Sequence, residues 1–256
     1  MKKILAIIIM VLGIGTLSFG ADKSLIKIQK AGKMIVGLDA TFAPMGFRDE
    51  KGEIVGFDID LANEVAKRLG IKAEFKPLEW DGIIFDLKSR KIDMVWNGMT
   101  ITEGRKKQIT FSDEYFQDGQ IIFSKKDDKI NKVEELKGKI VGVQLGGSGD
   151  FALQKSEVFP SIKAAKKYAT NVEALMDLEA GRIDAVVVDA VAGKYYNSKK
   201  NDLTYSNESL TKEYYGVGMR NEDKAFREAI NNKLSEMKAD GTFKVIYEKW
   251  FGKEEK

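Results

Sequence analysis

Residues 34–39, Met-Ile-Val-Gly-Leu-Asp, and residues 58–70, Asp-Ile-Asp-Leu-Ala-Asn-Glu-Val-Ala-Lys-Arg-Leu-Gly, decide the class of fold. The first segment is a short apolar run that ends at a carboxylate, which is typical of a buried strand. The second has apolar residues at positions 61, 62, 65, 66 and 69, the spacing of one helix face, and Gly70 follows as a C-cap. Residues 73–77 then alternate in polarity as a half-exposed strand does, so these segments predict a strand–helix–strand unit.

Short apolar runs and amphipathic segments continue to alternate along the rest of the chain. We expect further strands over residues 92–96, 121–123, 140–143 and 185–188. We expect further helices over residues 83–87, 133–136, 149–153, 172–178, 224–237 and 243–250. This order predicts an α/β fold with a largely parallel sheet, and 256 residues are enough for two modest lobes.

The N-terminus has the pattern of a secretory signal peptide. Lys2 and Lys3 precede an apolar run over residues 4–12, and small residues follow at Ser18, Gly20 and Ala21. The apolar run is shorter than the ~20 residues that span a bilayer. We therefore expect residues 1–20 to be a signal peptide that is cleaved after Gly20.

Cysteine and histidine are both absent from the sequence. Without cysteine the fold has no disulfide and no thiol for a lipid anchor, so we expect a freely soluble exported protein, which suits a periplasm. Without histidine there are no Ser-His or Cys-His dyads and no HExxH metal sites. We expect no catalytic residue, no bound metal and no cofactor.

The balance of charges gives no reason to expect a nucleic-acid partner. The formal charge of +3 falls to +1 when residues 1–20 are removed, because they contain two lysines and no acid. Lysines are interspersed with acids along the chain, which is typical of a solvated surface. We expect a monomer.

Three motifs carry a resemblance to a known family. The first is Asp39-Ala40-Thr41-Phe42-Ala43-Pro44 followed by Gly56-Phe57-Asp58-Ile59-Asp60-Leu61; the second is Gly98-Met99-Thr100-Ile101-Thr102 with Arg105 and Phe111-Ser112-Asp113; the third is Gly181-Arg182-Ile183-Asp184-Ala185-Val186 leading to Asp189. In order and spacing, the chain resembles the periplasmic binding proteins for polar amino acids across the whole mature sequence. That group, solute-binding protein family 3 of ABC transporters, holds the glutamine, histidine and lysine/arginine/ornithine binders.

The resemblance implies a two-lobed periplasmic-binding-protein fold of type II with the ligand in the cleft between the lobes. Residues 25–114 with 216–256 would form lobe 1, residues 120–210 lobe 2, and residues 115–119 and 211–215 the hinge strands. It also implies that a free L-amino acid is captured by hinge closure and delivered to an integral membrane ABC permease.

A site for a free amino acid needs a cationic fork for the carboxylate, an anion for the ammonium and a shaped pocket for the side chain. Arg105 is the natural fork, because a guanidinium binds a carboxylate through two parallel hydrogen bonds, and Thr100 and the backbone of Gly98 would contribute close by. Asp189, at the end of a strand, would take the ammonium. The Gly146-Gly147-Ser148-Gly149 turn opens a helix whose backbone N–H groups can face the carboxylate.

The resemblance places further residues in the same pocket. Phe42 and Trp80 would line the two sides of the pocket for the ligand side chain, and Asp39 would belong to the same pocket. The complete predicted site is Asp39, Phe42, Trp80, Asn97, Gly98, Met99, Thr100, Arg105, Gln144, Gly147, Ser148 and Asp189.

Each assignment has a purely structural alternative. Arg105, beside two lysines, could be a solvated helix charge, and Asp189 could cap a helix that begins near Ala190. Phe42 and Trp80 could be core aromatics, Asp39 a strand-end cap, and the glycine-rich turn merely flexible.

The identity of the amino acid stays open between two chemical groups. Carboxylates at Asp39, Glu79, Asp81 and Asp150, with Trp80 to stack on a cation, favour lysine or arginine. Asn97 and Gln144 would equally suit a neutral polar ligand such as glutamine or cystine. Gly104, Gly147, Gln144 and Asn97 depart from the patterns of relatives, which puts the ligand in doubt and leaves the class intact.

Two other functions remain as alternatives. A few relatives of the family are dehydratases, so the first is a lyase acting on small carboxylic acids on the same fold. The second is a sensory or adhesive role, in which the bound lobes report to a partner other than a permease.

Overall fold

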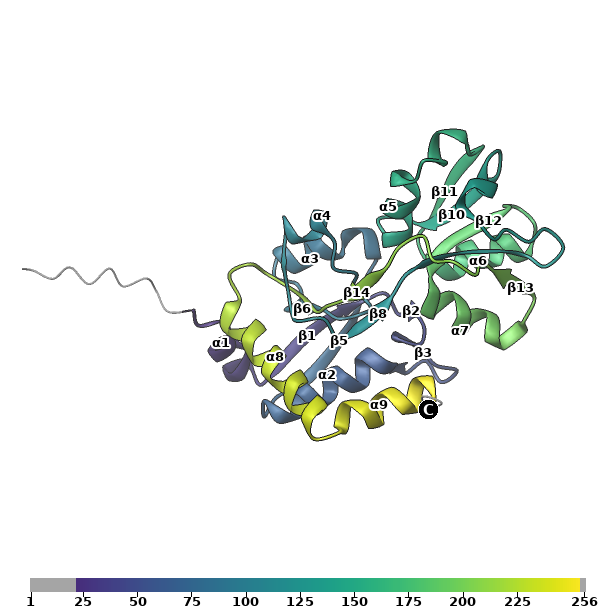
Figure 1. The fold of residues 1–256 in the computed structure, drawn as a ribbon. Coiled ribbons are helices and arrows are strands. Elements are labelled where there is room, and N and C mark those ends of the chain that lie inside the picture. Colours follow the sequence, from purple (N-terminus) through teal and green to yellow (C-terminus); the bar gives the residue numbers. More distant parts are fainter. Residues whose placement is uncertain (1–21, 254–256) are drawn as a thin grey trace, which may run out of the picture.

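A computed structural model describes residues 22–253 of the chain and shows two α/β lobes joined by extended crossovers (Figure 1). The predicted signal peptide over residues 1–20 lies outside the described residues. Within residues 22–253, every helix is too short or too polar to cross a bilayer.

The first lobe is built on a five-stranded sheet whose order is β5-β1-β6-β15-β7. Its strands are β1 (Lys33–Leu38), β5 (Lys72–Pro77), β6 (Met94–Val95), β7 (Thr110–Phe111) and β15 (Gly218–Met219). Strand β1 is parallel to both β5 and β6, whereas β15 is antiparallel to β6 and β7. Strand β15 comes from the C-terminal part of the chain, so this lobe is assembled from two distant segments.

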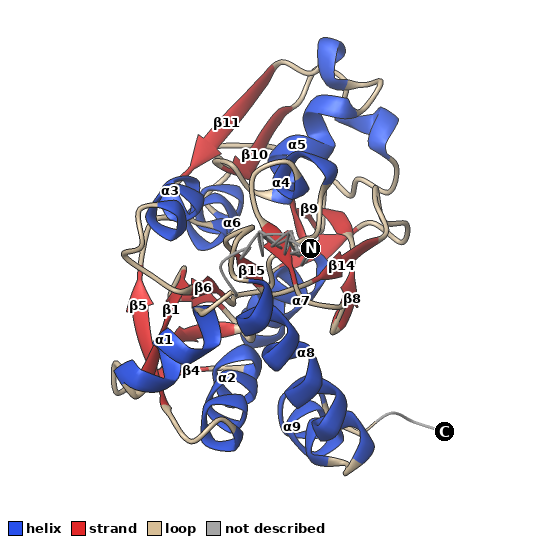
Figure 2. Ribbon diagram, turned by 90° about the vertical axis from the view of Figure 1, so that its left-hand side faces the viewer, coloured by secondary structure: helices blue, strands red, loops and turns tan. Residues whose placement is uncertain are grey.

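Helices cover both faces of this sheet (Figures 1 and 2). They are α1 (Ser24–Ala31), α2 (Phe57–Arg68), the 3₁₀ turn η1 (Trp80–Gly82), α3 (Ile83–Lys88), α4 (Glu103–Lys106), α8 (Lys224–Ala239) and α9 (Thr242–Phe251). A small antiparallel sheet of β2 (Thr41–Phe42), β3 (Gly46–Arg48) and β4 (Ile54–Val55) follows β1.

The second lobe contains a five-stranded sheet of order β11-β10-β12-β9-β13. Its strands are β9 (Gln120–Lys125), β10 (Ile140–Gln144), β11 (Ala164–Tyr168), β12 (Ala185–Asp189) and β13 (Leu203–Tyr205). Its helices are the 3₁₀ turns η2 (Val133–Leu136) and η3 (Phe159–Ser161), with α5 (Ser148–Lys155), α6 (Asn171–Glu179) and α7 (Ala190–Lys200). Strand β9 lies antiparallel between β12 and β13.

The α/β class, the two lobes and the largely parallel sheets predicted from the sequence are confirmed. Each five-stranded sheet has one antiparallel strand, β15 in the first and β9 in the second, and both of these strands follow a crossover between the lobes. The strand expected over residues 92–96, however, is only two residues long in the structure, as β6.

The crossovers form an antiparallel pair between the lobes. Strand β8 (Phe116–Asp118) pairs with β14 (Glu213–Tyr215), with Asp118 opposite Glu213 and Phe116 opposite Tyr215. The aromatic rings of Phe116 and Tyr215 stack with centroids 5.6 Å apart. Both connections between the lobes therefore run side by side.

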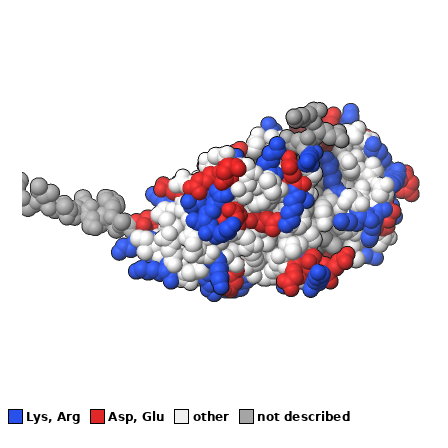
Figure 3. Space-filling view, turned by 90° about the horizontal axis from the view of Figure 1, so that it is seen from below, with Lys and Arg blue, Asp and Glu red and all other residues white. Residues whose placement is uncertain are grey.

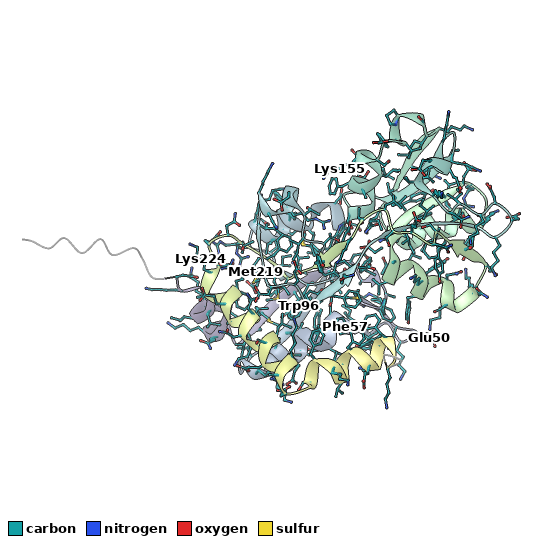
Figure 4. All side chains as sticks on the ribbon, viewed as in Figure 1. Glu50, Phe57, Trp96, Lys155, Met219 and Lys224 are labelled. Atoms are coloured by element: carbon teal, nitrogen blue, oxygen red, sulfur yellow. The ribbon has the colours of Figure 1, made fainter. Side chains whose placement is uncertain are left out.

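Apolar side chains fill each lobe along the periodicities that the sequence predicted. In the first lobe Phe57, Trp96 and Met219 are fully buried (Figure 4), and in the second Phe123 and Val143 are. Complete burial of a side chain of this size contributes about 1.5–3 kcal/mol. Charged side chains of both signs are interspersed on the face shown in Figure 3.

Candidate functional site

The ends of four strands meet at a narrow cavity between the lobes. Asp39 follows β1, Asn97 follows β6, and Gln144 and Asp189 are the last residues of β10 and β12. The residues that line the cavity are Asp39, Phe42, Trp80, Asn97, Gly98, Gln144, Gly147, Ser148 and Asp189. These are nine of the twelve residues in the predicted site, and the open volume among them is only about 10 Å³.

Arg105 is a buried side chain that contacts both lobes. Its Nη1 donates to the carbonyl oxygen of Thr100 at 2.9 Å, and its Nη2 donates to that of Gly146, in the second lobe, at 3.2 Å. The guanidinium lies over the ring of Trp80, 5.5 Å from its centroid. With 5% of its surface exposed, Arg105 is not the solvated helix charge of the structural alternative.

Burial lowers the pKa of Arg105 to about 10, against the attraction of Asp189 and Glu213. The side chain therefore remains a cation at neutral pH. Helix α4 places it, because Thr102 accepts a hydrogen bond from the Arg105 backbone N–H at 3.2 Å as the N-cap.

Thr100 and Ser148 meet across the cleft, with their hydroxyl oxygens 3.2 Å apart. Thr100 also donates to Glu213 at 3.0 Å. Gln120 Nε2 lies 3.0 Å from the Ser148 hydroxyl and 3.1 Å from Glu213. A buried polar network thus joins the two lobes and the hinge strand β14 at one point.

Asp189 occupies the N-cap position of α7, but its side chain makes no capping hydrogen bond. Its Oδ1 instead accepts a hydrogen bond from the hydroxyl of Tyr215 at 2.7 Å. Burial raises the pKa of Asp189 to about 7, and repulsion from Asp118 and Glu213 acts in the same direction. The carboxyl group is consequently held at the cleft and does not cap the helix that follows it.

Asp39 uses one carboxylate oxygen for a structural contact and the other for a contact across the cleft. Its Oδ1 accepts from the backbone N–H and hydroxyl of Thr41 at 2.9 and 2.7 Å, which caps the strand end. Its Oδ2 faces the cleft and accepts from Gln144 Nε2, in the other lobe, at 2.8 Å. Asn171 donates to Gln144 Oε1 at 3.2 Å and so fixes which end of the Gln144 amide faces Asp39.

Gly98 allows the backbone to approach the ring of Phe42 closely. Its φ is +58°, and a Cβ at this position would lie 2.5 Å from the ring of Phe42. Its N–H donates to the buried Asp58 at 2.6 Å, and Asp58 also accepts from Tyr115 at 2.9 Å. Burial raises the pKa of Asp58 to about 7.

The glycine-rich turn places the N-terminus of α5 at the cleft. Gly147 is the N-cap residue and Ser148 the first residue of the helix. A Cβ at Gly149 would lie 2.7 Å from the carbonyl oxygen of Val187, so the helix can approach β12 only with glycine there. The turn is therefore packed against its lobe, contrary to the flexible alternative.

Met99 lies behind the cavity rather than along it. With Trp80, Arg105 and Gly146 it lines a larger pocket of about 590 Å³, to which both lobes contribute residues. Lys155, on α5, also lines this pocket.

Of the four carboxylates that favour a cationic ligand, one lies at the inner cavity. Glu79 and Asp81 are exposed, and Asp150 is buried in an ion pair with Lys167 at 3.0 Å. Asp39 alone of the four lines the inner cavity. The sequence could not distinguish these positions, because a carboxylate near a strand end can turn either way.

Several residues at the cleft were not predicted. Asp118, Glu213 and Tyr215 come from the hinge strands, Gln120 begins β9, and Asn171 begins α6. Only the hinge strands, residues 115–119 and 211–215, were expected as segments, and that expectation did not mark individual residues.

Comparisons with known proteins point to one family. Residues 34–253 match the model of the bacterial extracellular solute-binding proteins, family 3. The L-cystine-binding protein TcyJ of Escherichia coli K12 is 35% identical over 246 residues, which cover 95% of this chain and 91% of that protein.

Two solved structures are similar over nearly their full lengths. An ancestral arginine-binding protein bound to arginine has a TM-score of 0.83 at 48% identity, covering 86% of this chain and 99% of that one. The second structure is a substrate-binding protein of an ABC uptake transporter from Streptococcus pneumoniae with bound histidine. Its TM-score is 0.86 at 35% identity, and the match covers 91% of this chain and 97% of that one.

Proposed function

Because the chain belongs to family 3 of the bacterial extracellular solute-binding proteins, we propose that it captures a free L-amino acid between its lobes and delivers it to an ABC permease. The likeness to ligand-bound relatives also confirms the two-lobed type II fold that the sequence predicted. The observation that carries the proposal is the presence of a buried cation, Arg105, and a buried carboxyl group, Asp189, at one cleft.

In the proposed complex the carboxylate of the amino acid contacts both lobes, and its ammonium group contacts the second lobe. Arg105, Thr100 and Ser148 bind the carboxylate, with the N-terminus of α5 directed at it. Asp189 binds the ammonium group. A hydrogen bond to a charged group contributes about 1.5–3 kcal/mol, so a few of them, less the costs of ordering, can support the roughly −8 kcal/mol of micromolar binding.

The remaining predicted residues shape the side-chain end of the pocket. Phe42 and Trp80 form its walls, and Asp39, Asn97 and Gln144 supply polar groups. Gly98 and Gly147 allow the backbone to come close, and Met99 supports Trp80 from behind.

We propose hinge closure as the mechanism, with residues 25–114 and 216–256 as one lobe, 120–210 as the other, and 115–119 and 211–215 as the hinge. The described arrangement has the contacts of a closed form: Gln144 with Asp39, Arg105 with Gly146, and Thr100 with Ser148. A ligand that binds both lobes favours this state through its differential contacts.

For the ligand we propose a cationic amino acid, lysine or arginine, as the first candidate. Asp39 Oδ2 accepts a hydrogen bond from an amide across the cleft, and a cationic side chain would take that place with a stronger, charge-assisted bond. Glutamine or cystine is the second candidate, supported by the amides of Asn97 and Gln144 at the same end.

The relatives are binding proteins, and we propose that this chain has no catalytic activity, which leaves the lyase alternative without support. We also propose that it acts in the periplasm as a monomer, after removal of the signal peptide, and is not a lipoprotein.

The test is a calorimetric titration of the refolded, ligand-stripped protein with the twenty amino acids, cystine and ornithine. We expect one-to-one binding of one chemical group, abolished by Arg105→Ala and by Asp189→Ala. Arg182→Ala is the matched control, because Arg182 is exposed and paired with Asp177 far from the cleft, and it should bind normally. Absence of heat with every compound would contradict the proposed function.

A further inference from the structure

Two carboxyl groups share a single tyrosine hydroxyl directly behind the ligand cleft. The hydroxyl oxygen of Tyr215 lies 2.7 Å from Oδ1 of Asp189 and 2.6 Å from Oδ2 of Asp118. Asp189 belongs to the cleft, whereas Asp118 is the last residue of the hinge strand β8 and has no part in the proposed contacts with the ligand.

The number of protons at this group does not match two ionised carboxylates. A tyrosine hydroxyl has one proton to donate, so it can satisfy only one carboxylate oxygen at hydrogen-bond distance. The tyrosine oxygen and the carboxylate oxygen that receives no proton would then repel each other at the same short separation. One additional proton removes the conflict, because a protonated carboxyl donates to the tyrosine oxygen while the tyrosine donates to the remaining carboxylate.

The charges around the pair favour that additional proton. Glu213 adds negative charge from β14, and Arg105 is the cation that acts on Asp189 from α4. Burial raises the pKa of Asp118 to about 6, and Glu213 acts in the same direction, although Tyr215 and the backbone N–H of Val191 oppose the shift. Burial likewise raises the pKa of Tyr215, which therefore keeps its own proton.

We propose that Asp118 and Asp189 hold one proton between them through Tyr215 in the free protein, and that the ammonium group of an amino acid displaces it on binding. The inference rests on the proposed function, because Asp189 is the group that receives the ammonium there. Asp118 acts through Tyr215 and is thus a positioning residue rather than a ligand contact.

The proton balance of the step is simple. The amino acid enters with its ammonium group intact and forms a charge-assisted hydrogen bond with the ionised Asp189. The proton formerly held by the pair passes to the solvent, and Tyr215 then donates to one of two carboxylates whose repulsion the ammonium offsets.

Proton release makes binding depend on pH with a defined sign. Below the range in which the pair loses its proton, each unit of decrease in pH costs about tenfold in affinity for one proton released. Above that range the pair is already ionised, and affinity becomes independent of pH. We expect weakening from about pH 7 toward pH 5, while the amino acid itself keeps its charges.

The test is calorimetry of L-arginine binding, with L-glutamine as a second probe, in pairs of buffers with different ionisation enthalpies. At pH 6 we expect close to one proton released per amino acid bound, and at pH 8 close to none. Binding without proton release at pH 6 would overturn this inference and leave the proposed function intact, whereas absence of binding by these two and by every other compound of the titration panel would contradict the proposed function.

Two variants distinguish the loss of the shared proton from a general structural effect of a substitution. In Asp118→Asn the amide can donate to the tyrosine oxygen, so proton release at pH 6 should fall toward zero and the pH dependence should flatten. Asp127→Asn, in the exposed turn after β9, is the matched control and should release the proton as the wild type does. Equal release from Asp118→Asn and wild type would overturn the assignment.

A measurement on the free protein needs no ligand. Carbon-13 NMR of labelled aspartate side chains should show a carboxyl signal that titrates near neutral pH in the wild type and is lost in Asp118→Asn. Asp58, which also has a raised pKa, should titrate in both proteins. If only Asp58 remains protonated at pH 6 in the wild type, the shared proton does not exist.

Discussion

At the scale of single residues, Asp39 divides its two oxygens between the turn that holds it and the cleft. One oxygen caps the strand end through Thr41, and the other meets Gln144 of the opposite lobe. The structural and functional alternatives considered for this residue are therefore compatible, because a carboxylate has enough acceptor sites for both.

Asp39→Asn should discriminate between the two candidate ligand groups. The asparagine oxygen can keep the contacts with Thr41, but the cleft then faces a neutral amide. If arginine binds as proposed, its affinity should fall about 10–100-fold, which corresponds to the loss of a charge-assisted hydrogen bond. Affinity for glutamine should change little, as measured by calorimetric titration.

Asp49→Asn is a matched control for this substitution. Asp49 also accepts local backbone hydrogen bonds, from Lys51 and Glu53, but in an exposed turn. It should bind both amino acids normally. An equal loss of arginine and glutamine binding in Asp39→Asn would argue that the residue acts only as a cap.

The sequence predicted the cavity residues better than the residues behind them. Arg105, Asp189 and Ser148 were predicted because ligand chemistry restricts the side chains that can serve. Asp118, Tyr215 and Asn171 were missed because they act through other residues, and that role depends on which side chains meet in space. The pattern of one sequence does not contain this information.

At the scale of elements, periodicity was a good guide where a helix has one wide apolar face. Helices α2 and α8 lie within two residues of their predicted ends. The short α1 and the strands β11 and β13 were not predicted. In β11 three of five residues are exposed, so burial leaves little pattern on the sequence of this edge strand.

The crossovers of the hinge make a prediction at this scale. A Cβ at Gly119, which follows β8, would collide with the backbone oxygen of Thr211, which precedes β14. Gly119→Ala should push the crossovers apart and lower the free energy of unfolding by about 1–3 kcal/mol, the usual cost of overpacking. Urea denaturation measures this change.

Gly82→Ala is the control for the hinge substitution, because a Cβ there meets no atom within 4 Å. Its unfolding free energy should stay close to that of the wild type. Equal stability of the two variants would show that the crossovers are free to separate at Gly119.

At the scale of the whole molecule, aromatic side chains join the lobes on the side of the cleft opposite α3 and α5. Tyr195 of α7 packs on Phe47 of β3, with ring centroids 5.7 Å apart, and Phe47 packs on Trp250 of α9 at 6.0 Å. An aromatic pair contributes about 0.5–1.5 kcal/mol beyond its buried area. This contact stabilises the closed arrangement only.

Tyr195→Ala should therefore weaken amino-acid binding about 2–10-fold without a matching loss in stability. Small-angle scattering should show a larger radius of gyration for the ligand-free variant. Tyr205→Ala is the control, because Tyr205 packs on Phe123 within one lobe, and it should leave affinity unchanged. Unchanged affinity and dimensions in Tyr195→Ala would contradict a role for this contact in closure.

The place of β15 in the first sheet also sets the order in which the lobes can be completed during synthesis. Strand β15 lies between β6 and β7, so β7 joins its sheet only after residues 218–219 have been made. The second sheet is contiguous in sequence and can assemble earlier. A nascent chain on the ribosome therefore carries a first lobe whose sheet stays incomplete until residues 218–219 emerge.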